Sequence, residues 1–168
     1  SHGKPYLDEP FTDRNIRFNM SHSHTLALYA IAQGREVGID VEQIREGFAD
    51  DSIAEQFFAP GEVRALRALA ADLQAEAFFN CWTRKEAYIK ARGEGLSLPL
   101  DQFCVSLVPG EPAELQSTQE ALDGDPSKAA RWSFCHVSSC PGYAAALVVE
   151  GEGSRSEQVR FWQWSAYL

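Results

Sequence analysis

The sequence predicts an α+β domain in which a mostly antiparallel sheet is covered by one long helix. Apolar runs of strand length recur along the chain and are separated by turn residues. Residues 73–92 instead show apolar residues at helical spacing and end before Gly93, a residue suited to close a helix. With 168 residues, of which 45% are hydrophobic, the chain can bury the core of one ordinary domain. We therefore treat residues 1–168 as a single domain.

The first half of the chain predicts an extended start, a hairpin and a short helix. Ser1 and His2 have the character of a cloning remnant, and the residues that follow are rich in proline, aspartate and arginine. Pro60 stands where a helix would begin, because its fixed φ suits the first turn. The expected segments are a loop over 3–19, antiparallel strands over 25–32 and 36–42, and a helix over 60–69.

The second half predicts the long helix followed by more strands. A loop over 95–100 follows the helix, and the polar, acidic stretch 109–128 predicts an exposed excursion. Strands are expected at 103–108, 131–136, 143–150 and 159–164.

Charge and cysteine usage exclude several classes of protein. The chain has 15 Lys plus Arg against 24 Asp plus Glu, a formal net charge of -9, which argues against a nucleic-acid binder. No apolar run approaches the roughly 20 residues that span a bilayer, so we expect no membrane segment. The four cysteines form no C-x-x-C pair and no secretory signal precedes them, which predicts reduced thiols in a cytoplasmic protein and disfavours a zinc site.

Asp40 and Glu42 are the first candidate functional residues. Side chains two apart in a strand share a face, so these carboxylates project together, roughly 7 Å apart. Ile39 and Val41 then face the core. For this pair alone, the solvated edge of a half-buried strand is the commoner interpretation.

The long helix adds a third carboxylate. Glu86 falls on the same helical arc as Phe79 and Trp82, with Lys90 at its edge, whereas Arg84 points the opposite way. An exposed Glu86–Lys90 pair at i, i+4 is one interpretation, but it leaves the inward direction of Glu86 unexplained. If the three carboxylates converge, they offer hard oxygen ligands that suit Mg²⁺ and a substrate phosphate.

The segment 18–24 supplies donors suited to phosphate, notably Ser21, His22 and backbone N–H groups. An ordinary polar turn is the alternative. The chain lacks G-x-x-x-x-G-K-[ST], G-x-G-x-x-G and G-x-S-x-G, so it predicts no P-loop, no dinucleotide fold and no serine hydrolase.

Together these segments resemble one family, the 4′-phosphopantetheinyl transferases of the larger, surfactin-synthetase type. The resemblance covers residues 3–108, with 141–143 as a weaker late match, and the pairing of G-I-D-x-E with W-x-x-K-E-x-x-x-K gives it specificity. The matching segments are G-K-P at 3–5, N-M-S-H-S at 19–23, G-I-D-V-E at 38–42, F-F at 57–58 with Glu62, F-F-N-C-W-T-R-K-E-A-Y-I-K at 78–90, and G-L-S-L-P-L at 95–100.

The resemblance implies Mg²⁺-dependent transfer of 4′-phosphopantetheine from coenzyme A to a serine of an apo acyl- or peptidyl-carrier protein. Adenosine 3′,5′-bisphosphate would be released. By resemblance, the residues that hold the metal are Asp40, Glu42 and Glu86, and those that contact coenzyme A are Lys4, Pro5, Asn19, Ser21, His22 and Lys90. For the base that accepts the serine proton, we expect Glu86 first and Glu62 second. Residues 43–58, with Ile44, Phe48 and Ile53, resemble the carrier-docking segment, and ordinary packing is the alternative.

One departure bears on activity. Members of this type carry two similar halves with the coenzyme between them, and this chain resembles only the C-terminal half. An excised domain, a truncated chain and self-association that rebuilds the cleft all remain open. The alternative function is therefore a non-catalytic half-enzyme that binds a carrier protein or a partner domain. A third interpretation, an unrelated Mg²⁺ phosphohydrolase, is supported only by the three carboxylates, and the other motifs disfavour it.

Overall fold

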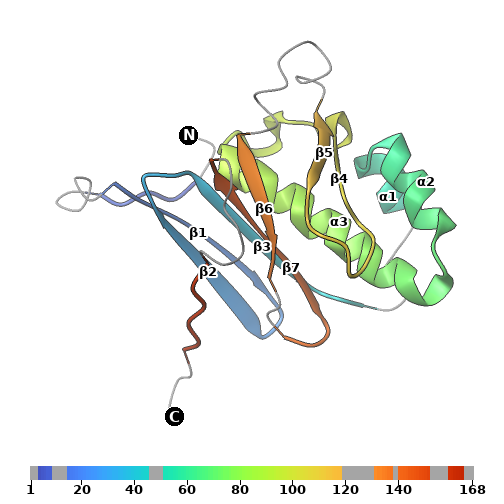
Figure 1. The fold of residues 1–168 in the computed structure, drawn as a ribbon, viewed down its shortest axis with the longest axis horizontal. Helices are drawn as coiled ribbons and strands as arrows, with labels where there is room; N and C mark the ends of the chain where they lie inside the picture. The colour runs from blue at the N-terminus through green and yellow to red at the C-terminus, as the bar shows by residue number, and fades with distance from the viewer. Residues whose placement is uncertain are drawn as a thin grey trace.

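Three antiparallel sheets and one long helix form the described part of the chain, which confirms the predicted α+β class (Figure 1). The structure is a computed structural model, and it describes residues 4–8, 15–45, 51–118, 131–137, 140–151 and 159–164. The strands are β1 (Ile16–Ser23), β2 (Leu26–Gln33), β3 (Val37–Gln43), β4 (Phe103–Val105), β5 (Leu115–Thr118), β6 (Trp132–His136) and β7 (Tyr143–Glu150). The helices are α1 (Asp51–Phe57), α2 (Pro60–Ala68) and α3 (Ala71–Arg92), with short 3₁₀ turns η2 (Gly95–Ser97) and η3 (Leu100–Gln102).

Strand pairing differs from the predicted hairpin. We expected 25–32 to pair with 36–42, but β2 pairs with β1, and β3 pairs with β7, which also pairs with β6. The true turn lies at His24, whose φ of +53° places it in the left-handed region. The predicted loop over 3–19 likewise ends in β1. That strand escapes a search for apolar alternation because its inward residues include Asn19, Ser21 and Ser23.

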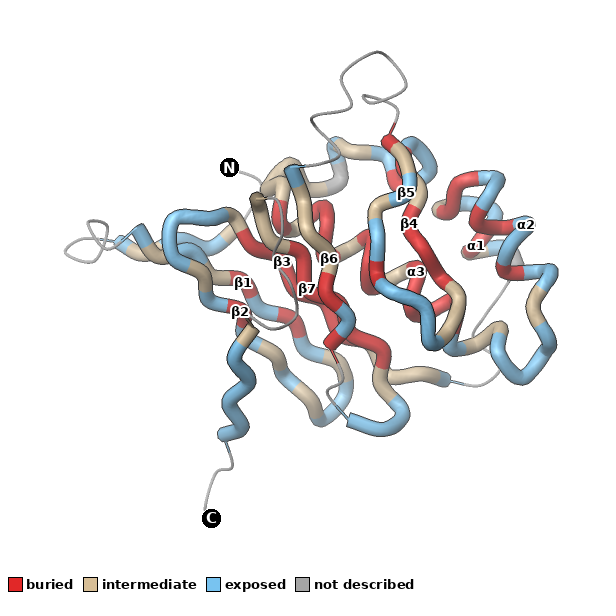
Figure 2. The backbone as a smooth tube through the Cα atoms, viewed as in Figure 1, coloured by how far each residue is buried: buried red, intermediate tan, exposed pale blue. Residues whose placement is uncertain are grey.

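The central sheet β3–β7–β6 has a different layer on each side (Figure 1). On one side the hairpin β1–β2 covers Ile39 and Val41 of β3, which form a small apolar cluster with Ala30 and Leu147. On the other side α3 packs against alternate small residues of β7 in the main core. Figure 2 shows that buried residues concentrate along β3, β7, α3 and β4. The carboxylates of β3 therefore sit where the hairpin, the sheet and the helix meet.

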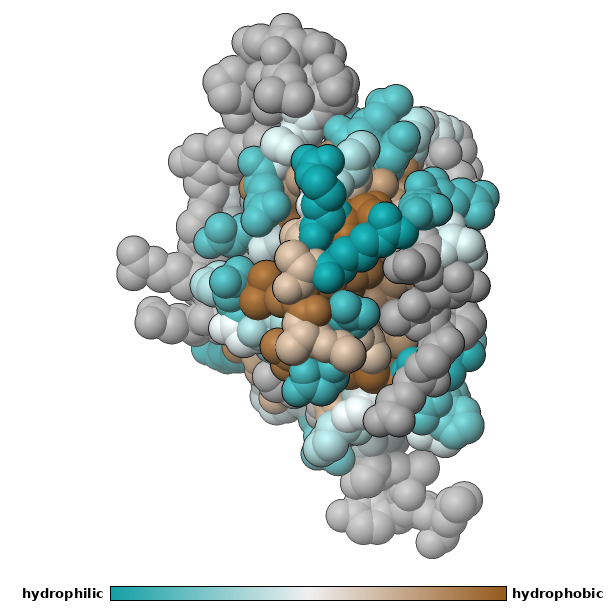
Figure 3. All heavy atoms as spheres, turned by 90° about the vertical axis from the view of Figure 1, so that its right-hand side faces the viewer, coloured by the Kyte–Doolittle hydropathy of each residue, from teal (hydrophilic) through white to brown (hydrophobic). Residues whose placement is uncertain are grey.

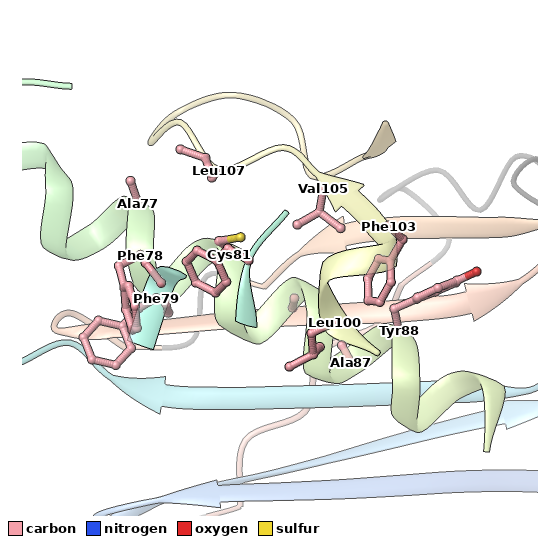
Figure 4. Packing of buried hydrophobic residues seen from close by; sticks show 14 of the residues in the cluster. Ala77, Phe78, Phe79, Cys81, Ala87, Tyr88, Leu100, Phe103, Val105 and Leu107 are labelled. Atoms are coloured by element: carbon pink, nitrogen blue, oxygen red, sulfur yellow. The ribbon is translucent and has the colours of Figure 1, made fainter. Parts of the chain in front are cut away.

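α3 is buried on both of its sides rather than along one stripe. Its second side is covered by η3 and β4, whose Leu100, Phe103 and Val105 lie against the helix (Figure 4). Arg84 does point away from the sheet as predicted, but this side is also covered, and Arg84 is buried there. Gly93 closes the helix with a φ of +70°, as its position in the sequence predicts.

Two predictions for the later chain need correction. The stretch 109–128 is not wholly an exposed excursion, because β5 forms within it, pairs with β4 and buries Thr118. Residues 119–130 lie outside the described part. Residues 159–164 are described and form no strand, and their aromatic side chains Phe161, Trp162 and Trp164 are exposed, so alternation of apolar residues was misleading there.

Figure 3 shows the face of the molecule over α1 and α2. Apolar residues lie near the centre of this face, and hydrophilic side chains lie across and around them.

Across the described helices, none combines the length and the apolarity that a bilayer crossing requires.

Candidate functional site

Asp40 is the centre of the candidate site, at the junction of β1, β3 and α3. Its carboxylate is 4% exposed, and Oδ1 accepts hydrogen bonds from Ser21 Oγ at 2.8 Å and from Lys90 Nζ at 2.6 Å. Lys90 Nζ also lies 3.3 Å from Ser21 Oγ. Asp40 Oδ2 is buried and has no hydrogen-bond partner among the described residues. A buried, unsatisfied carboxylate oxygen is costly, so this atom is an acceptor in need of a donor or a cation.

β1 supports these carboxylates through its polar inward face. The backbone N–H groups of Ile39 and Gln43 on β3 donate to Asn19 Oδ1 at 2.9 Å and to Ser23 Oγ at 3.1 Å. Ser23 Oγ in turn donates to Glu42 Oε2 at 2.7 Å. At the edge of β3 that is not paired with β7, side chains of β1 therefore bond to the β3 backbone, and they orient its acidic residues. Ser21 makes the third contact of this kind, accepting from a β3 N–H at 3.4 Å.

Glu86 lies on the α3 side of the same junction and is half-buried. Burial raises its pKa above the ordinary value, and the charges of Asp40 and Glu42 raise it further, against the opposing effect of Lys90. Burial also raises the pKa of Asp40, and it outweighs the ion pair with Lys90 and the Ser21 hydrogen bond, which act in the opposite direction. The three predicted carboxylates thus share one electrostatic environment, with Lys90 as their nearest cation.

The donor chemistry at this junction suits a divalent cation. Carboxylate oxygens are the ligands that Mg²⁺ prefers, and Asp40 Oδ2 is a carboxylate oxygen without a hydrogen-bond partner among the described residues. In the described part of the chain, however, no three His, Cys, Asp or Glu side chains are arranged closely enough to hold a metal ion. Lys90 instead neutralises Asp40. The residues fit the ion in type, and the assignment of Asp40, Glu42 and Glu86 as its ligands stays a prediction.

Glu62 does not belong to this site, and its prediction as an alternative base is wrong. Its side chain is 3% exposed, and both oxygens are occupied by partners in the core. Oε2 accepts from the Ala59 N–H at the start of α2 and lies 2.7 Å from Lys85 Nζ. Oε1 accepts from the Val105 N–H at 2.7 Å. A carboxylate engaged in this way cannot reach an incoming hydroxyl.

The predicted coenzyme contacts separate into three groups. Ser21 and Lys90 meet at Asp40. Lys4 lies at the end of α3, where Nζ contacts Glu36 Oε2 at 2.6 Å and donates to the Ala91 carbonyl at 2.7 Å. The remaining three differ in exposure: Pro5 and His22 are exposed, whereas Asn19 is buried and bonded to β3. Asn19 therefore has a structural role, and its contact with coenzyme A stays a prediction.

Three residues that matter to the site were not singled out by sequence reasoning. Ser23 orients Glu42, and the polar alternation of residues 19, 21 and 23 is the signal that could have revealed it. Gly38 lets α3 approach β3, because a Cβ there would lie 2.1 Å from the Ala87 carbonyl oxygen. Lys85 is buried in the core, and a lysine between Arg84 and Glu86 gives no sequence signal of burial.

We expect Ser21→Ala to destabilise the chain by about 1–3 kcal/mol in denaturant unfolding. The substitution removes a donor from the buried Asp40 carboxylate and an acceptor from the Val41 N–H. His22→Ala is the matched control, because His22 is the next residue of β1 but is exposed, and its effect should stay within about 0.5 kcal/mol. Equal effects of the two substitutions would contradict the supporting role of the inward face of β1.

Comparison with known proteins places this geometry in a family. The model of the 4′-phosphopantetheinyl transferase superfamily matches residues 36–148, which contain β3, α3 and most of β7. The chain is 37% identical over 164 residues to 4′-phosphopantetheinyl transferase HetI of Nostoc sp., covering 98% of this chain and 63% of that protein. It is 41% identical over 106 residues to a 4′-phosphopantetheinyl transferase of Bacillus subtilis, covering 63% of this chain and 45% of that protein.

Two solved structures are also similar. The holo-[acyl-carrier-protein] synthase of Thermotoga maritima matches with 20% identity and a TM-score of 0.49, covering 70% of this chain and 64% of that chain. The Chronobacterium ammoniagenes ACPS-CoA complex matches with 23% identity and a TM-score of 0.48, covering 71% of this chain and 98% of that chain. The chain spans less than two thirds of the length of the two relatives reported above. On the strength of the family model and of these relatives, the chain belongs to the 4′-phosphopantetheinyl transferase superfamily.

Proposed function

We propose that this chain carries the acidic centre of a Mg²⁺-dependent 4′-phosphopantetheinyl transferase. The substrates would be coenzyme A and a serine of an apo acyl- or peptidyl-carrier protein, and the by-product would be adenosine 3′,5′-bisphosphate. The observation that carries the proposal is the junction at Asp40, where a carboxylate oxygen with no hydrogen-bond partner in the described chain, Lys90 and the interacting charges of Glu42 and Glu86 lie together. The relatives, which are named as 4′-phosphopantetheinyl transferases, support the choice of transferred group.

The acidic residues would hold the metal, and Lys90 would add a second cation. Asp40, Glu42 and Glu86 are the residues of this chain that would bind Mg²⁺. When bound, the ion would neutralise charge on the pyrophosphate of coenzyme A. Lys90 has a side chain that is 29% exposed, so its ammonium group is available to a phosphate oxygen as well as to Asp40. Positioning and charge neutralisation, rather than covalent catalysis, dominate phosphoryl transfer.

Glu86 is the residue that we propose as general base. The carrier serine Oγ would attack the phosphorus that bears the pantetheine arm while its proton passes to the Glu86 carboxylate. The bond from that phosphorus to the bridging oxygen would break, and the adenosine bisphosphate would leave with it. In the metal-free chain, burial and the charges of Asp40 and Glu42 raise the pKa of Glu86; its role as base rests on its place beside these residues, within reach of the proposed metal site.

The test is a transfer assay read by intact mass. The chain would be incubated with coenzyme A, Mg²⁺ and several apo carrier proteins, and we expect one carrier to gain the mass of one 4′-phosphopantetheine. The gain should disappear when EDTA replaces Mg²⁺. Unchanged masses for every carrier would contradict transfer by this chain.

A binding module without catalysis is the second candidate, and the ion pair with Lys90, which neutralises Asp40 without a metal, favours it. Calorimetry that detects carrier binding but no Mg²⁺-dependent binding of coenzyme A would support it.

We propose residues 43–58 as the carrier-docking segment. Ile44 and Ile53 of this segment pack partly against the core, and Phe48 lies outside the described residues. Sedimentation would show whether the chain self-associates.

The free thiols of all four cysteines, which lie in the described part, support the proposed cytoplasmic location.

A further inference from the structure

Lys85 is a fully buried cation on α3, directly before Glu86. It is 0% exposed, and its ammonium group donates to the carbonyls of Leu100 at 2.7 Å and Phe103 at 2.6 Å. Its third partner is Glu62 Oε2 at 2.7 Å. All three donors of the ammonium are thus directed to fixed atoms of η3, β4 and α2. The position of the side chain is determined from three directions.

Glu62 is held as firmly as its partner. Its two oxygens accept the N–H groups of Ala59 and Val105 at 2.8 Å and 2.7 Å, so the carboxylate connects the start of α2 to β4. The ion pair is therefore attached to rigid backbone at both ends. Because it is buried, its contribution to stability is small: replacing such a pair with apolar residues of similar size is often neutral or stabilising. The hydrogen bonds of the pair instead fix the orientation of the elements that it joins.

The orientation that matters is the rotation of α3 about its own axis. Successive helical residues point about 100° apart, so a fixed Lys85 determines where Glu86 points. Lys90, four residues after Glu86, lies on nearly the same side of the helix as Glu86, facing Asp40. Gly38 sets the approach of the helix to β3, because a Cβ there would lie 2.1 Å from the backbone of Ala87. The approach alone does not fix the rotation.

We propose that the Glu62–Lys85 pair is a positioning device that fixes the rotation of α3 and so holds Glu86 and Lys90 over the carboxylates of β3. This inference rests on the proposed function for its expected consequence, namely that the rotation of α3 affects the affinity for Mg²⁺. The rotation itself can be measured without the metal. Neither residue touches the reacting groups, and both act through the helix.

The test variant is Glu62→Gln/Lys85→Met, which removes both charges while keeping similar volumes and one acceptor for the backbone. The control is Glu150→Gln/Arg131→Met, which likewise removes both charges of an ion pair, here an exposed one beside β6 and β7. Thermal unfolding would first establish that both variants are folded. Calorimetry would then measure Mg²⁺ binding in the presence of coenzyme A, and NMR would record the NOE between Gly38 Hα and the Ala91 amide proton.

In the test variant we expect a 10- to 100-fold loss of Mg²⁺ affinity, the range seen when residues that orient metal ligands are replaced. The Gly38–Ala91 NOE should weaken or disappear, while the control matches the parent protein in both measurements. If the test variant does not fold, Lys85→Arg, which keeps the charge but changes its geometry, replaces it with the same expectations.

A folded variant with the parent Mg²⁺ affinity and an unchanged NOE would overturn the positioning role. If the parent chain itself binds no Mg²⁺, the proposed function fails, but the NOE still decides whether the pair orients α3. The two failures are therefore distinguishable.

Discussion

Glu86→Gln should lower the rate of phosphopantetheine transfer by at least about 100-fold, because it removes both a proton acceptor and a proposed metal ligand. The fold should survive, since glutamine has nearly the same shape and Glu86 is only half-buried. The rate would be measured by intact mass of the carrier under saturating coenzyme A. Glu76→Gln is the control, because Glu76 is an exposed carboxylate on the same helix, and it should leave the rate unchanged.

The same substitution should make the metal-free chain more stable at neutral pH. Burial, together with the charges of Asp40 and Glu42, raises the pKa of Glu86, so the folded chain holds this proton more tightly than the unfolded chain does. The cost of ionisation is absent below the ordinary carboxyl pKa of about 4.3 and grows as the pH rises towards the raised value. Glutamine does not ionise and avoids this cost.

The expected signature is a rise in the unfolding midpoint of Glu86→Gln over the parent chain at pH 7 that vanishes at about pH 4. Added Mg²⁺ should stabilise the parent chain more than the variant, because only the parent offers all three carboxylates. A variant that transfers at the parent rate, or that is less stable than the parent at pH 7, would contradict the placement of Glu86 among the other acidic residues.

The features of the site that the sequence predicted are those with local signals. α3 was recognisable from its apolar spacing, and Gly93 from its place after the last turn, since both depend on neighbours within a few residues. The alternation of β3 likewise predicted that Asp40 and Glu42 project from the same face, and the charges of both raise the pKa of Glu86.

The features that could not be predicted depend on residues far apart in the chain. β3 pairs with β7, and nothing in either strand specifies the other. β1 was missed because its inward side chains are hydrogen-bonding groups that serve the backbone of β3, whereas a search for strands looks for apolar alternation. Glu62 was misassigned because its partner Lys85 becomes visible only when α2 and α3 are packed together.

Gly38→Ala should be the most destabilising single substitution at the junction, with a loss of about 3 kcal/mol or more. The added Cβ would lie 2.1 Å from the Ala87 carbonyl oxygen and 2.3 Å from the Ala91 nitrogen, and backbone atoms in the last turns of a buried helix cannot move aside as a flexible side chain can. To relieve the clash, α3 must shift away from β3, which separates Glu86 and Lys90 from Asp40. Mg²⁺ affinity should therefore fall in any molecules that remain folded.

Gly61→Ala is the matched control for Gly38→Ala, because the nearest atom to an added Cβ at Gly61 is Arg64 Nη2 at 3.9 Å. Gly61 lies in the first turn of α2, where alanine restricts the unfolded chain and should be neutral or stabilising by up to about 1 kcal/mol. Denaturant unfolding of the two variants then compares the same added methyl group at a tightly packed position and at an exposed position. If Gly38→Ala unfolds at the parent midpoint, α3 does not need the close approach to β3, and the glycine of G-I-D-x-E has some other function.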